Sequence, residues 1–564
     1  MARDGVTTMK RYLVLALAAL IPVLPAYAAE IPDEQLRIVS WSNDTSSSTQ
    51  GELFDDFDVW SFIPSQIQIP TNEMERAGLS TGVVCDSVED VKCKDFLALM
   101  VRAYLPTCTD AQTQYCIESL FAIKNGVRYQ GNFKQPYPDV KTFGQFEAEP
   151  KYDLPAGGAG GLWQIPGLTH NGGGDLYWIN AQLIGSLNRA SQTDPWGKFN
   201  PNQLWSSISA VTEVSAPGSV APLAYKTGGS GTDTRPLTPT GEQCLVAGVD
   251  KCLLPWPLEE EIQYGMKVRM AHPITGWLHG RLNAPDFTAT TTADGFFHLT
   301  MIGNPVKVPT VFAITDWDKA TPEIKARFGG KPSGCCGGGT RWFDTAGRYQ
   351  SGEQMVADLK MWLPYIQEKA SATPTYWIVR TLPNHEIANK RQCLVSGAVN
   401  GIVTTNATAY TSGAPEFNQE TQSLDYQVAS PHNDRQGKVN IGNYNLQINS
   451  AVARCLYGFT DAPISATVSI VSENGENQVA TTTIKESNGW IYLKAAGFTY
   501  SSPTVKVKFE QKAPEVVTVV AKPAKPAKPA PVTAKKSTIT CAKGKAIKRV
   551  TAVKPLCPAG YKKR

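Results

Sequence analysis

The sequence predicts a mostly β protein with several domains, and three features of its composition support this. Its 564 residues exceed the roughly 100–200 residues of one typical domain. Glycine (47) and proline (39) are frequent and only 18% of residues are charged, which favours strands joined by many turns over long charged helices. With 42% hydrophobic residues, the chain is also too apolar to be disordered throughout.

The net charge of +4 hides two parts of opposite charge. No acidic residue follows Glu515, whereas residues 522–564 hold 13 lysines and arginines. Residues 29–515 hold 38 basic and 49 acidic residues, a net charge of −11. The sequence therefore describes an acidic body followed by a strongly basic tail.

The N-terminal residues are typical of a secretory signal peptide. Lys10 and Arg11 precede an apolar run at 12–24, and an Ala-x-Ala cleavage site ends at Ala28. The run is too short for a comfortable membrane span, and no later stretch of about 18 apolar residues occurs. We therefore expect residues 1–28 to be a signal peptide and the protein to be secreted.

Residues 29–390 are expected to form a β-rich body of one or two subdomains. Short apolar segments bounded by turn-forming residues predict strands in this body at 96–105, 117–123, 267–270, 277–282 and 296–302.

One helix is expected in the body, near residues 351–369. Ser351 is a candidate N-cap, and apolar residues then recur at spacings of three and four: Met355, Val356, Leu359, Trp362, Leu363 and Ile366. Pro364 should kink or end the helix, because proline cannot continue the backbone hydrogen bonds. The apolar face is most simply a packing surface.

From about residue 391 to 512 the pattern changes to closely spaced alternating segments, as in an immunoglobulin-like β-sandwich. Strands are expected at 401–405, 424–428, 444–448, 466–471, 479–484, 490–495 and 504–509. Asn488-Gly489 between two of these segments predicts a tight hairpin.

A linker and a small tail are expected after the sandwich. Residues 513–536 contain a Lys-Pro-Ala repeat, which predicts a disordered, extended polyproline spacer. Residues 537–564 form the basic tail and contain two cysteines.

Twelve cysteines in an exported chain predict disulfide bonds. Three pairs each enclose seven residues, one encloses fifteen and one brackets part of the sandwich: Cys85/Cys93, Cys108/Cys116, Cys244/Cys252, Cys541/Cys557 and Cys393/Cys455. Zinc is the alternative, but zinc sites favour closer spacings with histidine nearby. For the adjacent Cys335 and Cys336 a vicinal bridge, bonds to two different partners and a redox pair all stay open.

The tail resembles that of a known group of proteins. It begins TCAKGK (540–545), ends CPAGYKKR (557–564) and follows the Lys-Pro-Ala linker. This combination resembles the basic two-cysteine tail of uncharacterised exported cell-surface proteins of actinobacteria. RCLYGF (454–459), CIESL (116–120) and MWLP (361–364) in the body are similar to the same group. The resemblance implies a cell-surface location and brings no established catalytic residues.

The tail is suited to binding a polyanion through eight basic residues: Lys543, Lys545, Lys548, Arg549, Lys554, Lys562, Lys563 and Arg564. An anionic cell-wall polymer is the preferred partner, with the membrane surface as an alternative. Specific nucleic-acid binding is not expected, because Tyr561 is the tail's one aromatic residue. A tail that only aids export or solubility is the simpler alternative. Since no sortase-type Leu-Pro-x-Thr-Gly motif is present, attachment should be non-covalent.

Sequence signals for catalysis are weak. The metalloprotease helix, the Gly-x-Ser-x-Gly elbow and the phosphate-binding loop are absent, and no histidines pair at metal-binding spacing. We therefore expect no metal and no cofactor. Asp316 and Asp318 would share one face of a strand and could form the carboxylate pair of a glycoside hydrolase. Ordinary acidic turn residues are the simpler explanation.

The best candidate for a ligand site is a stretch of aromatic and polar residues among glycines: Trp163, His170, Asp175, Tyr177 and Trp178. The glycines would let the rings face an open groove, an arrangement that suits sugar rings. The alternative is that the rings pack in the core.

Together these features predict an exported, disulfide-bonded surface protein that is tethered non-covalently to the cell envelope by its tail. Its expected task is binding, adhesion or envelope structure rather than catalysis. A secreted polysaccharide-acting enzyme and a lattice-forming surface coat protein are the two alternatives.

Overall fold

The computed structural model describes residues 49–511 and 535–564, except for gaps at 55–64, 78–82, 112, 139–144, 220–237, 240–241, 243, 330–340, 347–351, 383–392, 394–397, 412–414, 459–463, 472–476, 479–480 and 501–503. The chain divides into two compact units, Met1–Lys512 and Ala513–Arg564. The predicted signal peptide, most of the predicted linker and the pair Cys335 and Cys336 lie outside the described residues.

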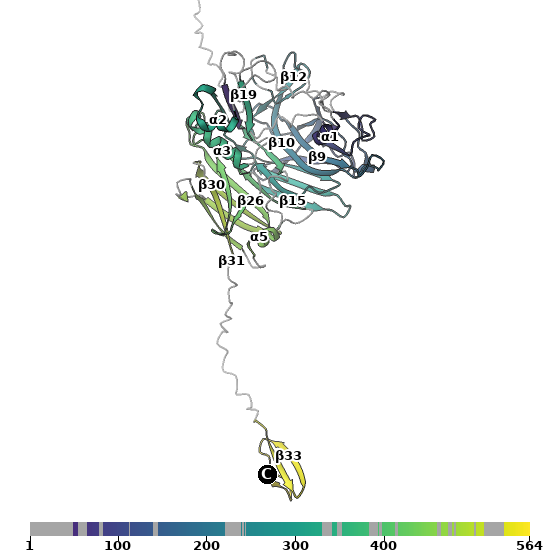
Figure 1. Ribbon diagram of the computed structural model, residues 1–564, viewed down its shortest axis with the longest axis vertical. Helices are drawn as coiled ribbons and strands as arrows, with labels where there is room; N and C mark the ends of the chain where they lie inside the picture. The colour runs from purple at the N-terminus through teal and green to yellow at the C-terminus, as the bar shows by residue number, and fades with distance from the viewer. Residues whose placement is uncertain are drawn as a thin grey trace, which may run out of the picture. The chain divides into compact units, whose positions relative to one another are not determined.

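The mostly β class predicted from composition is confirmed (Figure 1). One large sheet runs through the first unit in the order β29 (Thr481–Ser487), β30 (Trp490–Thr499), β26 (Ile441–Asn449), β22 (Val399–Thr405), β14 (Gly276–Arg281), β21 (Ile378–Thr381), β10 (Asn200–Ser215), β9 (Leu176–Asn188), β4 (Ala98–Tyr104), β2 (Gln66–Gln68) and β3 (Val84–Cys85). Branches of this sheet are β11 (Val246–Ala247) with β12 (Lys251–Trp256), and β7 (Asn132–Tyr137) with β8 (Gly160–Gln164).

The remaining strands of the first unit form smaller sheets. One has the order β15 (Asn283–Thr291), β16 (Phe297–Asn304), β13 (Gln263–Met270), β5 (Cys116–Lys124) and β6 (Val127–Gln130). Another has the order β23 (Ala409–Tyr410), β25 (Ser423–Ala429), β31 (Thr504–Gln511), β27 (Ile464–Val471) and β28 (Asn477–Gln478), with β24 (Glu416–Asn418) beside β25. The others are β18 (Val311–Asp316), β1 (Thr49–Phe54) and β19 (Arg341–Ala346), and the pair β17 (Val306–Lys307) and β20 (Thr375–Tyr376).

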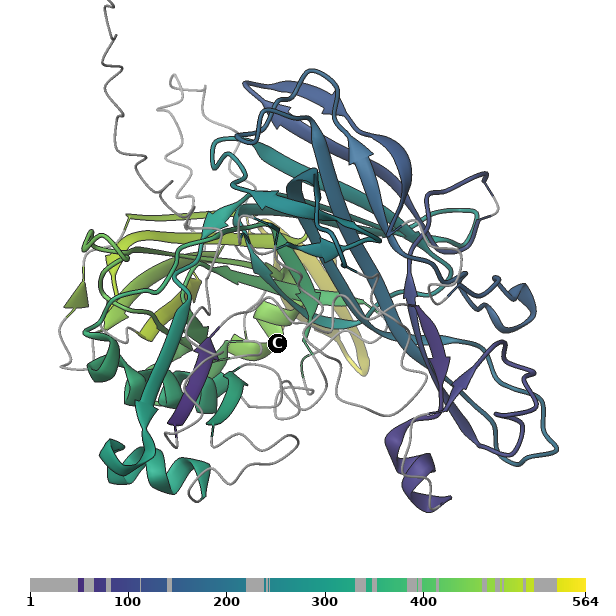
Figure 2. The ribbon, with the colours of Figure 1, turned by 90° about the horizontal axis from the view of Figure 1, so that it is seen from above.

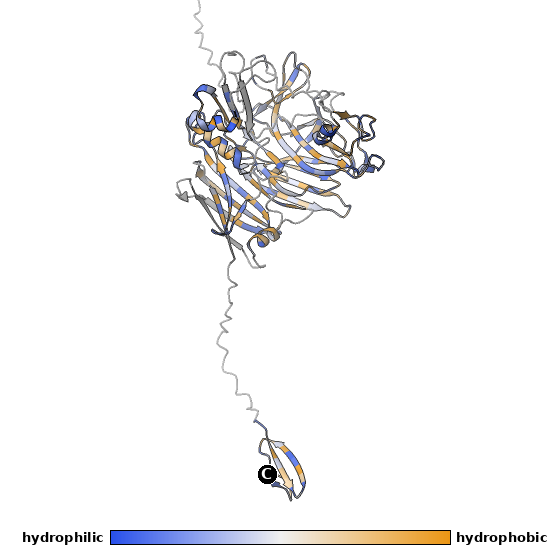
Figure 3. Ribbon diagram, viewed as in Figure 1, coloured by the Kyte–Doolittle hydropathy of each residue, from blue (hydrophilic) through white to orange (hydrophobic). Residues whose placement is uncertain are grey.

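Strand β1 shows how far apart in sequence neighbouring strands can be. It pairs antiparallel with β18 and parallel with β19, almost 300 residues further along the chain. Figure 2 shows this purple strand among teal and green segments. Apolar and polar residues alternate along many strands (Figure 3), which is the period-two pattern that predicted them.

The first unit carries more helices than the single one predicted. The described helices are α1 (Thr71–Arg76), α2 (Pro322–Phe328), α3 (Gly352–Trp362) and α5 (Ser450–Tyr457), with 3₁₀ turns η3 (Pro150–Tyr152), η4 (Trp317–Lys319) and η5 (Leu363–Ile366). The additional helices span only six to eight residues each, so apolar periodicity could not reveal them.

The predicted helix is present as α3. It ends at Trp362, and Pro364 lies in the 3₁₀ turn that follows, as expected from its missing N–H. Met355, Val356, Leu359 and Trp362 are buried, so the apolar face packs into a core. The proposed N-cap Ser351 lies outside the described residues.

Residues 391–512 do not form a sandwich that is separate from the rest of the first unit. Two sheets do share a core there, with Tyr426 of β25 and Leu446 of β26 in one buried cluster. However, the same cluster contains α3, and β22 pairs in parallel with β14, which lies before the predicted boundary. The boundary expected at residue 391 is therefore crossed by both the sheet and the core. A parallel partner more than 100 residues earlier leaves no local signal in the sequence.

Several local predictions are confirmed. Asn488 and Gly489 connect β29 to β30 with φ of 52° and 77°, and Ser487 pairs with Trp490 across the hairpin. These positive φ values are those of a type I′ turn. All five predicted disulfides form: Cys85–Cys93, Cys108–Cys116, Cys244–Cys252, Cys393–Cys455 and Cys541–Cys557. Such a set of disulfides fits an oxidising environment.

A buried arginine stabilises the junction of β14 and β22. Arg281 ends β14 and is 1% exposed. Its guanidinium donates to the carbonyl oxygens of Thr405 at 3.1 Å, Thr408 at 3.3 Å and Ala407. The same group lies 4.7 Å from the centre of the Tyr410 ring. The side chain thus satisfies carbonyl groups where the chain leaves β22, and these groups are remote from water.

We expect Arg281→Met to lower the free energy of unfolding by about 3 kcal/mol or more, because it leaves several buried carbonyl oxygens without donors. Urea denaturation of the full chain measures this. Arg435→Met, at an exposed position, is the control and should change stability by less than about 0.5 kcal/mol. Equal stability of the two variants would contradict the role given to Arg281.

Candidate functional sites

The predicted aromatic groove does not form, because its rings are buried. Trp163, His170, Tyr177 and Trp178 are at most 4% exposed, and only Asp175 is half-buried, where it accepts a hydrogen bond from Gln164 at 2.9 Å. Neighbouring strand residues point to opposite faces, so Tyr177 and Trp178 enter different cores. These residues are packing residues, and the alternative of a core position is the one that the structure supports.

The glycines of this stretch make room for the tryptophan rings. A Cβ atom on Gly160 would lie 2.6 Å from the Trp178 ring, and one on Gly161 would lie 2.7 Å from Nε1 of Trp163. Each distance is far inside a normal van der Waals contact. The glycine density that predicted an open groove instead reflects close approach of aromatic rings to a strand.

Asp316 and Asp318 do not form a carboxylate pair on one strand face. Asp316 is the last residue of β18 and binds Lys319 at 2.7 Å, whereas Asp318 lies in the 3₁₀ turn η4. The alternation that would place both on one side of a strand stops at Asp316. Trp317 between them is buried, so the segment is a turn anchored by one ring. It gives no geometric support to glycoside hydrolysis.

A compact charge cluster surrounds Glu118 on β5. Its carboxylate binds Lys267 at 2.6 Å and Arg269 at 3.0 Å on β13, and His298 at 2.9 Å on β16. Burial opposes ionisation of Glu118, but the hydrogen bonds from these three side chains outweigh it and lower its pKa to about 2. The cluster ties three neighbouring strands together.

The basic tail is a small three-stranded sheet. Its order is β33 (Ala546–Ala552), β32 (Ser537–Lys543) and β34 (Lys562–Lys563), and the Cys541–Cys557 disulfide closes it. All eight predicted polyanion-binding residues are exposed.

The register of the tail distributes its cations over both faces. Cys541 pairs with Lys548 on one side and with Lys563 on the other, so these two lysines share a face. Thr540 pairs with Arg549, and Ala542 pairs with Lys562, which places these two cations on the opposite face. Both faces of the tail therefore present positive charge.

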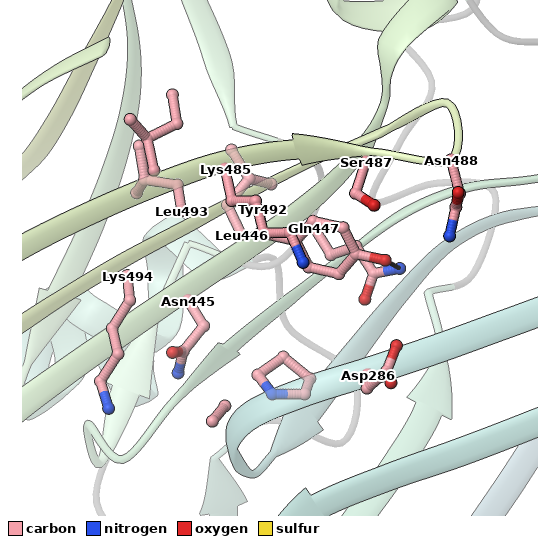
Figure 4. Close-up of a pocket in the computed structure, with 13 residues that line it drawn as sticks. Asp286, Asn445, Leu446, Gln447, Lys485, Ser487, Asn488, Tyr492, Leu493 and Lys494 are labelled. Carbon is pink, nitrogen blue, oxygen red and sulfur yellow. Dashed lines mark hydrogen bonds between the residues drawn. The ribbon is translucent and has the colours of Figure 1, made fainter. Parts of the chain in front are cut away.

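The first unit contains a pocket that is not among the sites predicted above. It has a volume of about 540 Å³ and lies between the start of β15 and strands β26, β29 and β30 (Figure 4). Its floor holds two buried amides, Asn445 and Gln447, which are 2% and 1% exposed. Figure 4 shows Asn445 beside Lys494, and Asp286 across from Gln447.

Hydrogen bonds hold the two floor amides in place. Gln447 accepts from the backbone N–H of Phe287 at 3.2 Å and donates to the Phe287 carbonyl at 3.1 Å. Asn445 donates to the hydroxyl of Thr404 at 3.0 Å, and its carbonyl oxygen has no hydrogen-bond partner among the described residues. The pocket therefore has a fixed polar floor with one unused acceptor.

Tyr492 and two lysines complete the pocket. Tyr492 pairs with Gln447 across strands β30 and β26, and the Gln447 Nε2 donates to the Tyr492 hydroxyl at 3.5 Å. Burial, together with the carboxylate of Asp286, raises the pKa of Tyr492, so the hydroxyl stays protonated at neutral pH. Lys485 and Lys494 lie on either side of the floor and are at least partly exposed.

One pattern in the sequence coincides with this pocket. In β26 the residues Asn443, Asn445, Gln447 and Asn449 alternate with the core residues Tyr444, Leu446 and Ile448. A strand face made entirely of amides is unusual, because Asn is depleted in strands. The covering segment near residue 285 could not be inferred, because it lies 160 residues away.

The described part of the chain has neither a cluster of metal ligands nor a membrane-spanning helix. There, no three His, Cys, Asp or Glu side chains are grouped so that they could hold a metal ion. No helix among the described residues is both long and apolar enough to cross a bilayer.

We expect Gly160→Ala to destabilise the protein by about 1–3 kcal/mol, because the added methyl group overlaps the Trp178 ring. Gly158→Ala is the matched control two residues away, since a Cβ there meets nothing within 4 Å. Thermal unfolding of both variants checks this. A neutral Gly160→Ala would show that the ring is not packed on the strand.

The Glu118 cluster should make stability depend on pH in acid. Its folded pKa of about 2 lies below the usual value of about 4.5, so its contribution is complete above pH 4.5 and is lost as the pH falls towards 2. We expect Glu118→Gln to cost about 1–2 kcal/mol at pH 7 and progressively less below pH 4.5. Denaturation of this variant and of the exposed control Glu261→Gln across pH measures it. A pH-independent difference would contradict the role of the ionised carboxylate.

In comparisons with known proteins, no family model, no curated protein and no solved structure matches this chain.

Proposed function

We propose that this protein is an exported component of the cell envelope that its basic tail attaches non-covalently to an anionic wall polymer. The observation that carries this proposal is the tail sheet, which presents eight exposed basic residues and no acidic residue. At physiological salt, charges interact over about 8 Å, so cations gathered on so small a sheet act together on a polyanion. The body is expected to serve in binding, adhesion or envelope structure.

The placement of the cations favours a polymer over a flat membrane. Lys548 and Lys563 lie on one face of the sheet, and Arg549 and Lys562 lie on the other. A planar lipid surface can contact one face at a time, whereas a flexible chain of phosphate or carboxylate groups can contact both. Exposed Ile547, Val553 and Leu556 in the tail are the feature that would suit a lipid surface instead.

The charge of the body explains why a separate attachment unit is useful. Residues 29–515 carry a net charge of −11, so an anionic wall repels them. The Lys-Pro-Ala composition of the linker predicts an extended spacer, which would keep the acidic body away from the polymer held by the tail. The resemblance of the tail to actinobacterial surface proteins supports the same location. The exposed charges of the tail also suit the alternative of a solubility aid, which the binding experiment tests.

We expect the full chain with Lys548→Glu, Arg549→Glu, Lys562→Glu and Lys563→Glu to lose binding to isolated cell walls. Binding of the unaltered chain should weaken about tenfold or more between 50 and 500 mM NaCl, because the contacts are ionic. The control carries the same charge change on exposed positions of the body: Lys94→Glu, Lys369→Glu, Arg435→Glu and Lys438→Glu. A sedimentation assay measures both variants.

Two outcomes would overturn the proposal. Wall binding that neither the tail variant nor salt reduces would show that the tail is not the attachment site. Binding to vesicles with anionic lipid headgroups, without binding to walls, would assign the tail to the membrane surface.

A further inference from the structure

We propose that the pocket between β15 and strands β26, β29 and β30 is a saccharide-binding site, with Asn445 and Tyr492 as its main contacts on a floor that Gln447 holds in place. This site belongs to the first unit and is independent of the attachment proposed for the tail. Its volume of about 540 Å³ is within the range of about 300–1,000 Å³ that is typical of small-molecule sites.

The floor of the pocket offers the polar groups that sugar hydroxyls need. A hydroxyl both donates and accepts, and a carboxamide also offers both kinds of group. The Asn445 side chain is 2% exposed, and its carbonyl oxygen has no hydrogen-bond partner among the described residues. A buried acceptor left without a donor costs free energy. A ligand hydroxyl that donates to this oxygen would recover that cost.

The pocket is pre-organised for such a ligand. Gln447 is held by two hydrogen bonds to the backbone of Phe287, so its amide cannot rotate freely. Asn445 is oriented by Thr404 on the neighbouring strand β22. Since these side chains are already fixed, little conformational entropy is lost when a ligand binds.

The rest of the lining suits a sugar ring better than other ligands. Tyr492 supplies an aromatic ring and a protonated hydroxyl next to the amides. Asp286 is the one carboxylate among the lining residues, which is too few for a hard metal ion. The same carboxylate opposes a simple anion, although Lys485 and Lys494 are near. Mixed amide, hydroxyl and charged groups around one ring match a polyhydroxylated, largely uncharged ligand.

Isothermal titration calorimetry of the full chain tests the site with four soluble tetrasaccharides: those of β-1,4-glucose, α-1,4-glucose, β-1,4-xylose and β-1,4-N-acetylglucosamine. We expect saturable binding of at least one of them, with a dissociation constant of about 0.1–1 mM, as for a shallow site with few buried contacts. Failure of all four to bind at 10 mM would overturn the proposal.

Variants place the binding in this pocket. Tyr492→Ala should weaken binding about tenfold, and Ser487→Trp should abolish it by filling the pocket while leaving every floor residue in place. The control Tyr129→Ala removes another partly buried tyrosine, on β6, and should leave binding unchanged. Thermal unfolding confirms that each variant is folded. Binding that survives Ser487→Trp in a folded protein would place the saccharide elsewhere and overturn the assignment.

The tail variant separates this proposal from the function proposed above. The tail variant carries Glu at Lys548 and Arg549 of β33 and at Lys562 and Lys563 of β34. It should leave tetrasaccharide binding unchanged, because the pocket residues belong to the first unit. Conversely, Ser487→Trp should leave salt-sensitive wall binding intact. Loss of saccharide binding in the tail variant would show that the pocket is not the site.

Discussion

The architecture of the first unit depends on the parallel pairing of β14 with β22. Residues before and after position 391 would otherwise form separate sheets, and this pairing joins them into one. Arg281 stabilises the junction, because its guanidinium satisfies carbonyl oxygens of residues 405, 407 and 408 where the chain leaves β22. A buried cation is costly without partners, so carbonyl groups and the Tyr410 ring together make this position tolerable.

The junction also creates the pocket. Because β22 and β26 continue the large sheet, the amide face of β26 lies next to the start of β15, which belongs to another sheet. Gln447 connects the two sheets through its hydrogen bonds to Phe287, a separation of 160 residues. The side chains that fix the packing of the sheets are therefore the same ones that form the polar floor.

The two proposed activities divide between the two units of the chain. The tail carries charge without a core of any size, since Cys541 is its one fully buried hydrophobic residue. Its disulfide and short strands hold the cations in register, and affinity then comes from charge. The body has an extensive core and a net negative charge, so recognition of a neutral ligand there depends on shape and hydrogen bonding. Under the two proposals, attachment and ligand binding would use separate sets of residues.

Features that depend on neighbouring residues could be predicted from the sequence alone. The Asn488-Gly489 hairpin, the end of α3 before Pro364, most strand positions and the four short-range disulfides follow from local spacing and backbone preference. The folded structure was needed to show which strands share a sheet, that Trp163 and Trp178 are core residues, and that Asn445 and Gln447 face a pocket. These features depend on pairing and burial partners that lie a hundred or more residues away in the chain. The glycines beside Trp163 fit either an open groove or a tight contact, and only the position of the rings distinguishes the two.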